Sequence, residues 1–292
     1  AATFSKTKRI LKEFRPDVIV GTGGYASFPA LKMGANLGIP TCVHESNAVP
    51  GLTTKLVART ASRVMVSFES SREHYPEPEK VLLTGTPVRE EFLFAKRQEA
   101  RRALGLGEEP LVVSCWGSLG AREMNKKIAQ FMKCECEDNT PFHHIHATGS
   151  FGWRWMPEYV KDMGVDLAAH PRIDMREYIY DMASVMRAAD LVICRAGAST
   201  LSELTALGVP AILVPSPNVT NHHQEKNAAV LGEHGAALVL PEEGLDGKRL
   251  FTEAAALLRD EARLAAMHEA SLRLGVRDAT ERIYETVMAL VK

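Results

Sequence analysis

Buried-strand patterns that end in glycine and lead straight into helix patterns recur along this chain, and this alternation constrains the fold most. β-branched and apolar runs begin at Val18, Leu111 and Leu191, and each is followed by a glycine-containing loop. Other strand patterns ("PTCVHES", "RVMVSF", "KVLLTG", "PAILVPSP") alternate with helix patterns in the same way. Strands that alternate with helices are typical of parallel, doubly wound α/β sheets.

The alternation occurs twice. A charged helix predicted over 97–106 and the linker "GLGEEP" separate two series of strand–loop–helix units within 292 residues. This length suits two α/β domains. We therefore expect an N-terminal domain over 1–93, a C-terminal domain over 94–275, and a last helix over 276–292 that packs back on the first domain. In such sheets, ligands bind outside the carboxyl ends of the strands, so two facing sheets would form a cleft.

Several local elements are also predicted. The pattern indicates a helix at 30–37, one uninterrupted helix at 220–234, and two helices after the strand pattern "AALVL". "RIDMREYI" is expected to lead into the helix "DMASVMRAA".

Charge and composition exclude some classes of protein. The net charge of −1 argues against a general nucleic-acid binder. No apolar run approaches the length of a membrane span. The five cysteines lack the paired spacing of a zinc finger, although Cys134 and Cys136 are close in sequence. We interpret them as reduced thiols of a cytosolic protein, and we expect no metal site.

Two glycine loops of the C-terminal half are candidate anion sites. "VVSCWGSLGA" offers Ser118 and the start of the following helix. In "CRAGASTLSEL" the small residues leave backbone donors uncovered, and Ser199 or Thr200 is expected to cap the helix. Glu203 is expected in the first turn, where it either stabilises the helix end or accepts the hydroxyls of a ribose.

Polar clusters supply the other candidate residues. In "NHHQEKNAAVL", the histidines and the amides Gln224 and Asn227 suit a metal, a general base or sugar hydroxyls. His144 and His146 share one face of a strand, and a strand end near a polar surface is the simpler account than a metal pair. "HESNAVPGL" places a histidine, a carboxylate and an amide at the end of a strand.

Together these motifs resemble one family. "GTGGYASFPA", "HESNAVPGL", "GTPVRE", "GSLGARE", "DLVICRAGASTLSEL", "GVPAILVPSP" and "HHQEKNA" are similar, in order and spacing, to those of MurG, a family of bacterial peptidoglycan glycosyltransferases. The resemblance implies the GT-B fold of two facing Rossmann-like domains. It also implies an inverting, metal-independent transferase that uses UDP-GlcNAc, without a cofactor, to glycosylate a polyprenyl-diphosphate-linked muramyl-pentapeptide. The predicted location is peripheral, on the cytoplasmic face of the cell membrane.

The resemblance also implies roles for individual residues. Glu203 matches the carboxylate that binds ribose, Ile179 the position whose backbone meets uracil, and Asn47 a donor-sugar contact. Ser118 and Arg89 match diphosphate contacts, and His223 and Gln224 match readers of sugar hydroxyls. The remaining donor loop is Ala198, Ser199, Thr200, Leu201 and Ser202. The loop that contains Gly23, Gly24 and Tyr25 is expected to face the diphosphate of the acceptor.

This sequence departs from the family pattern at two places. Family members begin with a further strand and a "GTGGH" loop, whose histidine is the favoured general base. Relative to that pattern this chain lacks the start of the sheet and that histidine, so the resemblance implies an incomplete N-terminal domain. Trp116 stands where the family usually has a glycine, and we expect the bulky side chain to change how closely a diphosphate approaches.

Two other functions remain open from the sequence. One is a glycolipid synthase of the same fold, and the other is a UDP-sugar-binding module that needs a partner chain. The membrane side is predicted at the helix "TFSKTKRILKEFR", where Phe4, Ile10, Leu11 and Phe14 lie among five basic residues. The alternative for this helix is an ordinary solvated surface.

Overall fold

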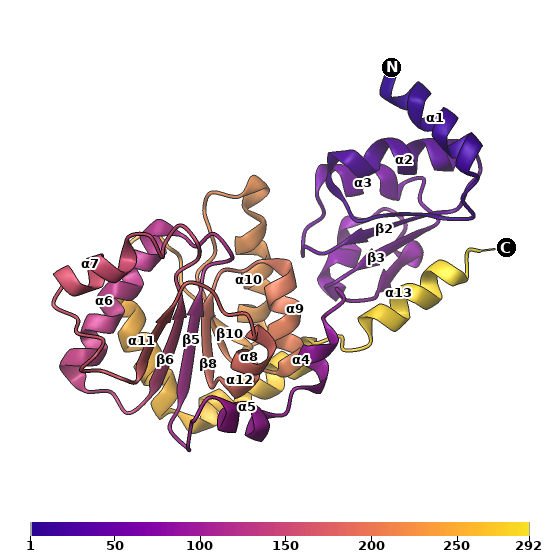
Figure 1. The fold of residues 1–292 in the computed structure, drawn as a ribbon. Helices are drawn as coiled ribbons and strands as arrows, with labels where there is room; N and C mark the ends of the chain where they lie inside the picture. The colour runs from indigo at the N-terminus through magenta and orange to yellow at the C-terminus, as the bar shows by residue number, and fades with distance from the viewer. Residues whose placement is uncertain (1, 292) are drawn as a thin grey trace. The chain divides into compact units, whose positions relative to one another are not determined.

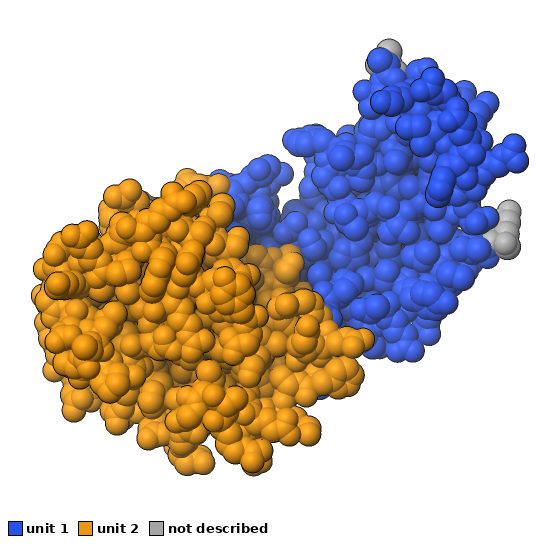
Figure 2. All heavy atoms as spheres, viewed as in Figure 1, with its two compact units in different colours: residues 1–88, 219–230, 276–292 blue, residues 89–218, 231–275 orange. Residues whose placement is uncertain are grey.

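The computed structural model describes residues 2–291 and divides them into two compact α/β units. Within the described residues, unit 1 comprises 2–88, 219–230 and 276–291, and unit 2 comprises 89–218 and 231–275 (Figure 2). Each unit contains one parallel sheet with helices on its faces (Figure 1). The predicted fold class, two doubly wound parallel-sheet domains, is confirmed.

Unit 1 is built on a four-stranded parallel sheet in the order β1-β2-β3-β4. Its strands are β1 (Ile19–Gly21), β2 (Thr41–Glu45), β3 (Arg63–Val66) and β4 (Val81–Leu83). Its helical segments are α1 (Ala2–Phe14), α2 (Gly24–Asn36), α3 (Leu52–Ala58), η1 (Glu69–His74), η2 (Pro78–Lys80), η3 (Thr220–His222) and α13 (Ala279–Met288). Helix α10 (His223–Glu233) begins in unit 1 and ends in unit 2.

Unit 2 is built on a six-stranded parallel sheet in the order β10-β9-β8-β5-β6-β7. Its strands are β5 (Leu111–Cys115), β6 (His143–Ala147), β7 (Ile173–Arg176), β8 (Leu191–Cys194), β9 (Ala211–Leu213) and β10 (Ala237–Val239). Its other helices are α4 (Glu90–Phe94), α5 (Arg97–Ala103), α6 (Arg122–Asp138), α7 (Met156–Asp162), α8 (Met182–Ala188), α9 (Ala198–Leu207), α11 (Gly247–Arg259) and α12 (Glu261–Leu274).

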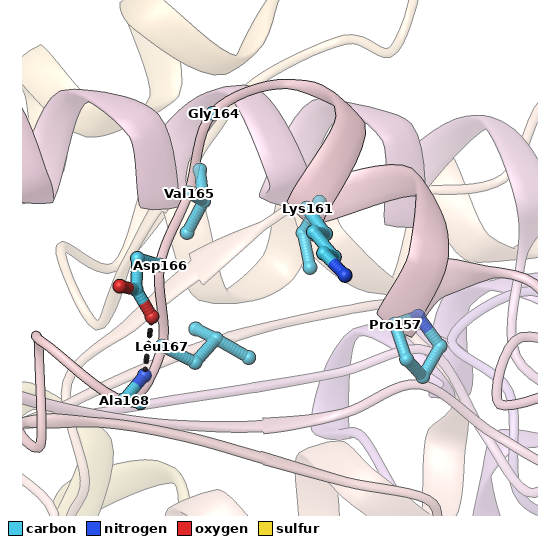
Figure 3. Close-up of a pocket in the computed structure, with 8 residues that line it drawn as sticks. Pro157, Lys161, Gly164, Val165, Asp166, Leu167 and Ala168 are labelled. Carbon is cyan, nitrogen blue, oxygen red and sulfur yellow. Dashed lines mark hydrogen bonds between the residues drawn. The ribbon is translucent and has the colours of Figure 1, made fainter.

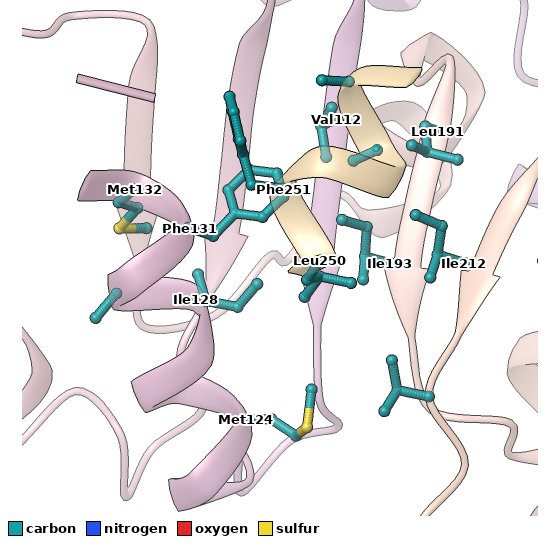
Figure 4. Packing of buried hydrophobic residues seen from close by; sticks show 14 of the residues in the cluster. Val112, Met124, Ile128, Phe131, Met132, Leu191, Ile193, Ile212, Leu250 and Phe251 are labelled. Carbon is teal, nitrogen blue, oxygen red and sulfur yellow. The ribbon is translucent and has the colours of Figure 1, made fainter. Parts of the chain in front are cut away.

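The core of unit 2 lies where α6 and α11 cover one face of the sheet. Phe131 of α6 packs edge-on against Phe251 of α11, with ring centroids 5.4 Å apart. Ile128 and Leu250 complete this layer over the apolar side chains of β5, β8 and β9 (Figure 4). All five residues of β5 are buried, as expected for a strand with helices on both faces.

Three predicted elements are wrong in detail, and one strand, β7, was not predicted. Helix α2 begins at Gly24 rather than at residue 30. The predicted 220–234 helix is interrupted, because Asn221 and His222 have φ of 56° and 50° and separate η3 from α10. Residues 173–176 form an edge strand, β7, which pairs with β6. Three helices, rather than two, follow the last strand.

Candidate functional site

The strand order of unit 2 reverses between β5 and β8, and two candidate loops begin at this point. Cys115, the last residue of β5, is the register partner of Cys194, the last residue of β8. The chain after Cys115 forms the loop that holds Ser118, and the chain after Cys194 leads into α9. A reversal of strand order leaves a crevice at the carboxyl edge, which is where ligands bind in such sheets.

The amino end of α9 carries no side-chain cap. Gly197 is the N-cap residue and is extended, with φ −70° and ψ 137°, and Ser199 and Thr200 lie inside the first turn. The expected serine or threonine cap is therefore wrong. Since the first N–H groups of a helix lack partners within the helix, this end of α9 suits an anion such as a phosphate.

Glu203 lies in the second turn of α9 rather than in the first turn that the sequence predicted. Its side chain is half-buried. Burial raises the pKa of the Glu203 carboxyl, and the positive charge of Arg89 partly opposes this rise. Within residues 2–291, no hydrogen bond joins this carboxylate to another group. A half-buried carboxylate without a donor is suited to the hydroxyls of a ligand.

Arg89 belongs to unit 2, where it precedes α4. Its guanidinium lies 5.1 Å from the ring centroid of Phe92, and its side chain is exposed. The structure thus places Arg89, Glu203, Ser118 and the start of α9 in one unit. The charge of Arg89 also acts on the carboxylate of Glu203.

The loop of Ser118 is held against the loop that follows β6. The N–H of Ser150 donates to the carbonyl of Ser118 at 3.1 Å, and Phe151 donates to Leu119 at 3.3 Å. Gly120 has φ +78°, and a Cβ there would lie 2.0 Å from the carbonyl oxygen of Thr148. Only glycine fits such a close approach of two backbones, so the sequence pattern Gly-x-x-Gly serves this packing.

Trp116 does not project into this loop. Its side chain is only 5% exposed and belongs to the core cluster of unit 2. The guanidinium of Arg195 lies 5.8 Å from its ring centroid. Arg195 in turn donates to Glu242 at 2.7 Å and to the carbonyl of Val214 at 3.0 Å. The indole therefore packs beneath the strand ends.

Ile179 lies in the segment between β7 and α8 and is buried. The flanking rings of Tyr178 and Tyr180 are exposed and make an edge-to-face contact with centroids 5.0 Å apart. This segment follows the carboxyl end of β7, the edge of the sheet at which Ser118 and Glu203 also lie.

The other candidate residues lie in unit 1. Gly23 is the N-cap of α2 with φ +82°, Gly24 opens that helix, and Tyr25 is 85% exposed. His223 and Gln224 are the first two residues of α10. The Nδ1 of His223 lies 2.9 Å from the carbonyl oxygen of Thr220, which orients the ring.

Asn227, one turn further along α10, is fully buried and is hydrogen-bonded to the loop after β2. It is therefore not an exposed reader of sugar hydroxyls, although the sequence pattern grouped it with Gln224. Asn47, in the loop after β2, is half-buried.

A buried polar network in unit 2 is not apparent from the sequence. The Oγ of Ser114 lies 2.7 Å from both His144 Nε2 and His146 Nδ1, and His144 Nδ1 lies 2.9 Å from Glu135 Oε2. Both histidines are fully buried. The expectation that they lie at a strand end near a polar surface is therefore wrong. Burial holds the pKa of His146 well below its usual value.

No metal centre is formed by the residues that the structure describes. No group of three or more His, Cys, Asp or Glu side chains in residues 2–291 could hold a metal ion. All five cysteines are free thiols. Burial raises the pKa of Cys42 to about 11 and that of Cys115 to about 12.

A cavity of about 500 Å³ lies between α7 and the loop that follows it (Figure 3). It is lined by Pro157, Val160, Lys161 and the segment 164–168, in which Asp166 accepts from the N–H of Ala168 at 3.0 Å. These residues belong to α7 and to the chain between α7 and β7. None of the candidate site residues lines it.

Comparison with known proteins identifies the family. Residues 111–283 match the glycosyltransferase family 28 C-terminal domain, and residues 1–66 match its N-terminal domain. The chain belongs to glycosyltransferase family 28. The resemblance inferred from the loops is thus confirmed over most of the chain.

Relatives within glycosyltransferase family 28 cover nearly the whole chain. A UDP-N-acetylglucosamine–N-acetylmuramyl-(pentapeptide) pyrophosphoryl-undecaprenol N-acetylglucosamine transferase of Acetivibrio thermocellus is 41% identical over 99% of this chain and 77% of its own length. A protein of the same name from Desulforudis audaxviator is 42% identical over 96% of this chain and 75% of its own. The crystal structure of Acinetobacter baumannii MurG superposes with a TM-score of 0.80 at 27% identity, over 99% of this chain and 79% of that one.

Proposed function

We propose that this member of glycosyltransferase family 28 transfers GlcNAc from UDP-GlcNAc to undecaprenyl-diphospho-N-acetylmuramoyl-pentapeptide, in the synthesis of peptidoglycan. The observation that carries the proposal is the set of groups at the β5/β8 reversal. Unit 2 holds all three groups: the uncapped start of α9, the half-buried carboxylate of Glu203, which has no hydrogen-bond donor, and Arg89, whose charge acts on that carboxylate. The names of relatives about 41% identical support the same substrates.

Each part of the donor has a proposed partner. Glu203 accepts the ribose hydroxyls, and the backbone of Ile179 meets the uracil. The amides at the start of α9, from Ala198 to Thr200, bind the diphosphate together with Ser118 and Arg89. Leu201 and Ser202 complete this loop, while Asn47, His223 and Gln224 are proposed contacts of the sugar.

The proposed reaction is an inverting displacement. A general base removes the proton of the acceptor 4-hydroxyl, and that oxygen attacks the anomeric carbon of GlcNAc from the face opposite UDP. The bond from the anomeric carbon to the diphosphate breaks, and its electron pair leaves with UDP. The positive end of α9 and the guanidinium of Arg89 stabilise the charge on the departing diphosphate. Gly23, Gly24 and Tyr25 are proposed to face the diphosphate of the acceptor.

The acceptor carries a long polyprenyl chain, so we propose that the protein works at an anionic membrane surface. None of the helices within residues 2–291 is long and apolar enough to cross a membrane. In α1, Leu11 is buried and Phe4 packs edge-on against Phe28, with centroids 6.1 Å apart. Ile10 and Phe14 remain exposed, on a helix that also carries exposed basic residues.

More apolar surface is exposed elsewhere in unit 1. Val20, Tyr25, Leu52 and Leu56 are each at least 45% exposed. Apolar side chains beside lysines and arginines suit a surface that rests on anionic lipid without spanning it. This observation supports peripheral binding through unit 1.

A transfer assay tests the proposed function. Labelled UDP-GlcNAc is incubated with the protein and either polyprenyl-diphospho-muramoyl-pentapeptide or diacylglycerol, with and without EDTA. We expect EDTA-resistant transfer to the first acceptor only. Transfer to diacylglycerol would identify a glycolipid synthase instead. UDP binding without any transfer would identify a sugar-nucleotide-binding chain that needs a further segment or partner for catalysis.

A further inference from the structure

The loop that follows β2 in unit 1 is organised by a buried carboxylate. Glu45 is 6% exposed. Its Oε1 accepts from the backbone N–H and from the side-chain Nδ2 of Asn47, both at 3.1 Å. Its Oε2 accepts from the N–H of Gly51 at 3.0 Å. One side chain therefore fixes both ends of the loop and one side of the Asn47 amide.

The other side of the Asn47 amide is fixed by α10. The Nδ2 of Asn227 donates to the Oδ1 of Asn47 at 3.1 Å, and the Oδ1 of Asn227 accepts from the N–H of Ala48 at 2.8 Å. Ser71, which is also buried, donates through its Oγ to the carbonyl of Ala48 at 2.8 Å. The loop is thus anchored to three separate parts of unit 1.

These bonds form a chain whose direction is determined at both ends. The N–H of Ala48 can only donate, so Asn227 must present its oxygen there and its nitrogen to Asn47. The Oε1 of Glu45 accepts from the N–H of Asn47 and from its side-chain nitrogen, so Asn47 presents its oxygen to Asn227. A flipped Asn47 amide would place oxygen against carboxylate and nitrogen against nitrogen. The orientation of Asn47 is therefore set by Glu45 and Asn227.

Asn47 keeps hydrogen-bonding capacity after these contacts. An amide nitrogen has two hydrogens and an amide oxygen has two lone pairs. The bonds to Glu45 and Asn227 use one of each, and Asn47 is half-buried rather than enclosed. The residue can therefore offer one donor and one acceptor, in a fixed arrangement, to two hydroxyls of a sugar.

We infer that Glu45 and Asn227 are positioning residues that hold the Asn47 amide in the orientation required by the sugar of the donor. This inference rests on the proposed function, in which Asn47 contacts the sugar of UDP-GlcNAc. Neither positioning residue need touch the ligand. A pre-oriented amide avoids the entropy loss of fixing a free side chain on binding. It also favours a sugar whose neighbouring hydroxyls match one donor beside one acceptor.

The test separates recognition of the sugar from recognition of the nucleotide. Calorimetry gives the Kd of UDP and of UDP-GlcNAc for the parent protein and for Asn227→Asp. Aspartate keeps the acceptor for Ala48 but places oxygen against the Oδ1 of Asn47. We expect the Kd of UDP-GlcNAc to rise at least about tenfold while that of UDP changes less than about twofold. Lys226→Ala, an exposed change on the same helix, is the matched control and should alter neither.

A purely structural role gives a different result. In that case Asn227→Asp lowers the melting temperature and raises the Kd of UDP and of UDP-GlcNAc by the same factor, or it changes neither Kd. Either result would show that the inference is wrong. In the Asn47→Ala background, Asn227→Asp should have no further effect on the ratio of the two Kd values, and an undiminished effect would also overturn it. If Asn227→Asp does not fold, Asn227→Ala serves, because it removes the donor to Asn47 without repulsion.

The proposed function fails separately. A parent protein that binds neither UDP nor UDP-GlcNAc contradicts the proposed function itself. A parent that binds both, with variants that leave the ratio of Kd values unchanged, contradicts only the positioning roles.

Discussion

Cys115 and Cys194 are register partners at the carboxyl ends of two adjacent parallel strands, β5 and β8. The strand order of the sheet reverses between these two strands. Both thiols are buried, and the negative charge of Glu203 adds to the effect of burial in raising the pKa of each. Glu203 therefore lies close enough to these strand ends to act on both. The thiols stay neutral and serve as small apolar side chains beneath the proposed donor site.

Glu203→Gln should weaken UDP binding by about tenfold to a hundredfold, because hydrogen bonds to a charged group contribute about 1.5–3 kcal/mol. Titration of UDP by calorimetry measures the loss.

The same substitution should also affect stability. Burial raises the pKa of the Glu203 carboxyl in the folded protein, so the folding free energy becomes less favourable as the pH rises from the ordinary pKa of a glutamate to this raised pKa. The variant should therefore melt at the same or a higher temperature than the parent. Unchanged UDP affinity would refute the role of Glu203 in binding, and a lower melting temperature would refute the destabilising effect of its ionisation.

Protonation of His146 should make the protein sensitive to acid. Its pKa in the folded protein is well below 6.5, so unfolding takes up a proton between that lower value and 6.5. The associated stability is fully present above about pH 6.5 and is lost as the pH falls, by at most about 1.4 kcal/mol per unit. We expect His146→Phe to flatten this slope in thermal melts, while His170→Gln, at a partly exposed position, leaves it unchanged.

Gly149→Ala should disturb the loop of Ser118. Gly149 has φ +75°, and a Cβ there would lie 2.1 Å from the backbone nitrogen of Gly120. Gly164 is the matched control, because it has φ +83° but no atom within 4 Å of an added Cβ. Gly164→Ala should cost only the backbone strain, about 1–2 kcal/mol. We expect Gly149→Ala to cost more and also to weaken UDP binding. Equal effects on melting temperature and no change in UDP affinity would contradict a link between the two loops.

Membrane binding through α1 is tested by charge reversal. Vesicles that contain phosphatidylserine are sedimented with the parent and with a variant that carries Lys8→Glu, Arg9→Glu and Lys12→Glu. Each basic residue near an anionic leaflet contributes about 1 kcal/mol, so binding should be reversible and salt-sensitive. The variant should stay in the supernatant and keep its affinity for UDP. Phe14→Ser should also weaken binding, because Phe14 is 77% exposed. Equal sedimentation of parent and variants would exclude α1 as the contact.

Much of the fold follows from local patterns in the sequence. Short apolar runs predicted nearly all strands of both sheets, because parallel strands covered on both faces are continuously apolar. The exception is β7, "IDMR", whose polar residues are tolerated at the edge of the sheet. Helix α7 was also not predicted.

The motifs, in their order and spacing, were sufficient to indicate the family and the type of donor. They could not show how the side chains are used, because partners lie far apart in the sequence. Asn227 was grouped with Gln224 as a sugar reader, yet it is buried against Asn47 and Ala48, about 180 residues earlier. His144 and His146 were placed near a polar surface, yet Ser114 and Glu135 pair with them in the core.

The sequence by itself therefore determined the class of sheet, the glycine loops and the family, since each depends on residues close together in the chain. Only the tertiary structure decided which polar groups are engaged and which remain available. Glu45 and Glu203 are both acidic residues in or beside a candidate loop. Packing supplies three N–H donors to the first and none to the second. Burying a carboxylate without hydrogen-bond donors costs free energy, and a ligand that supplies donors removes this cost. Glu203, rather than Glu45, is therefore the carboxylate that is available to bind a ligand.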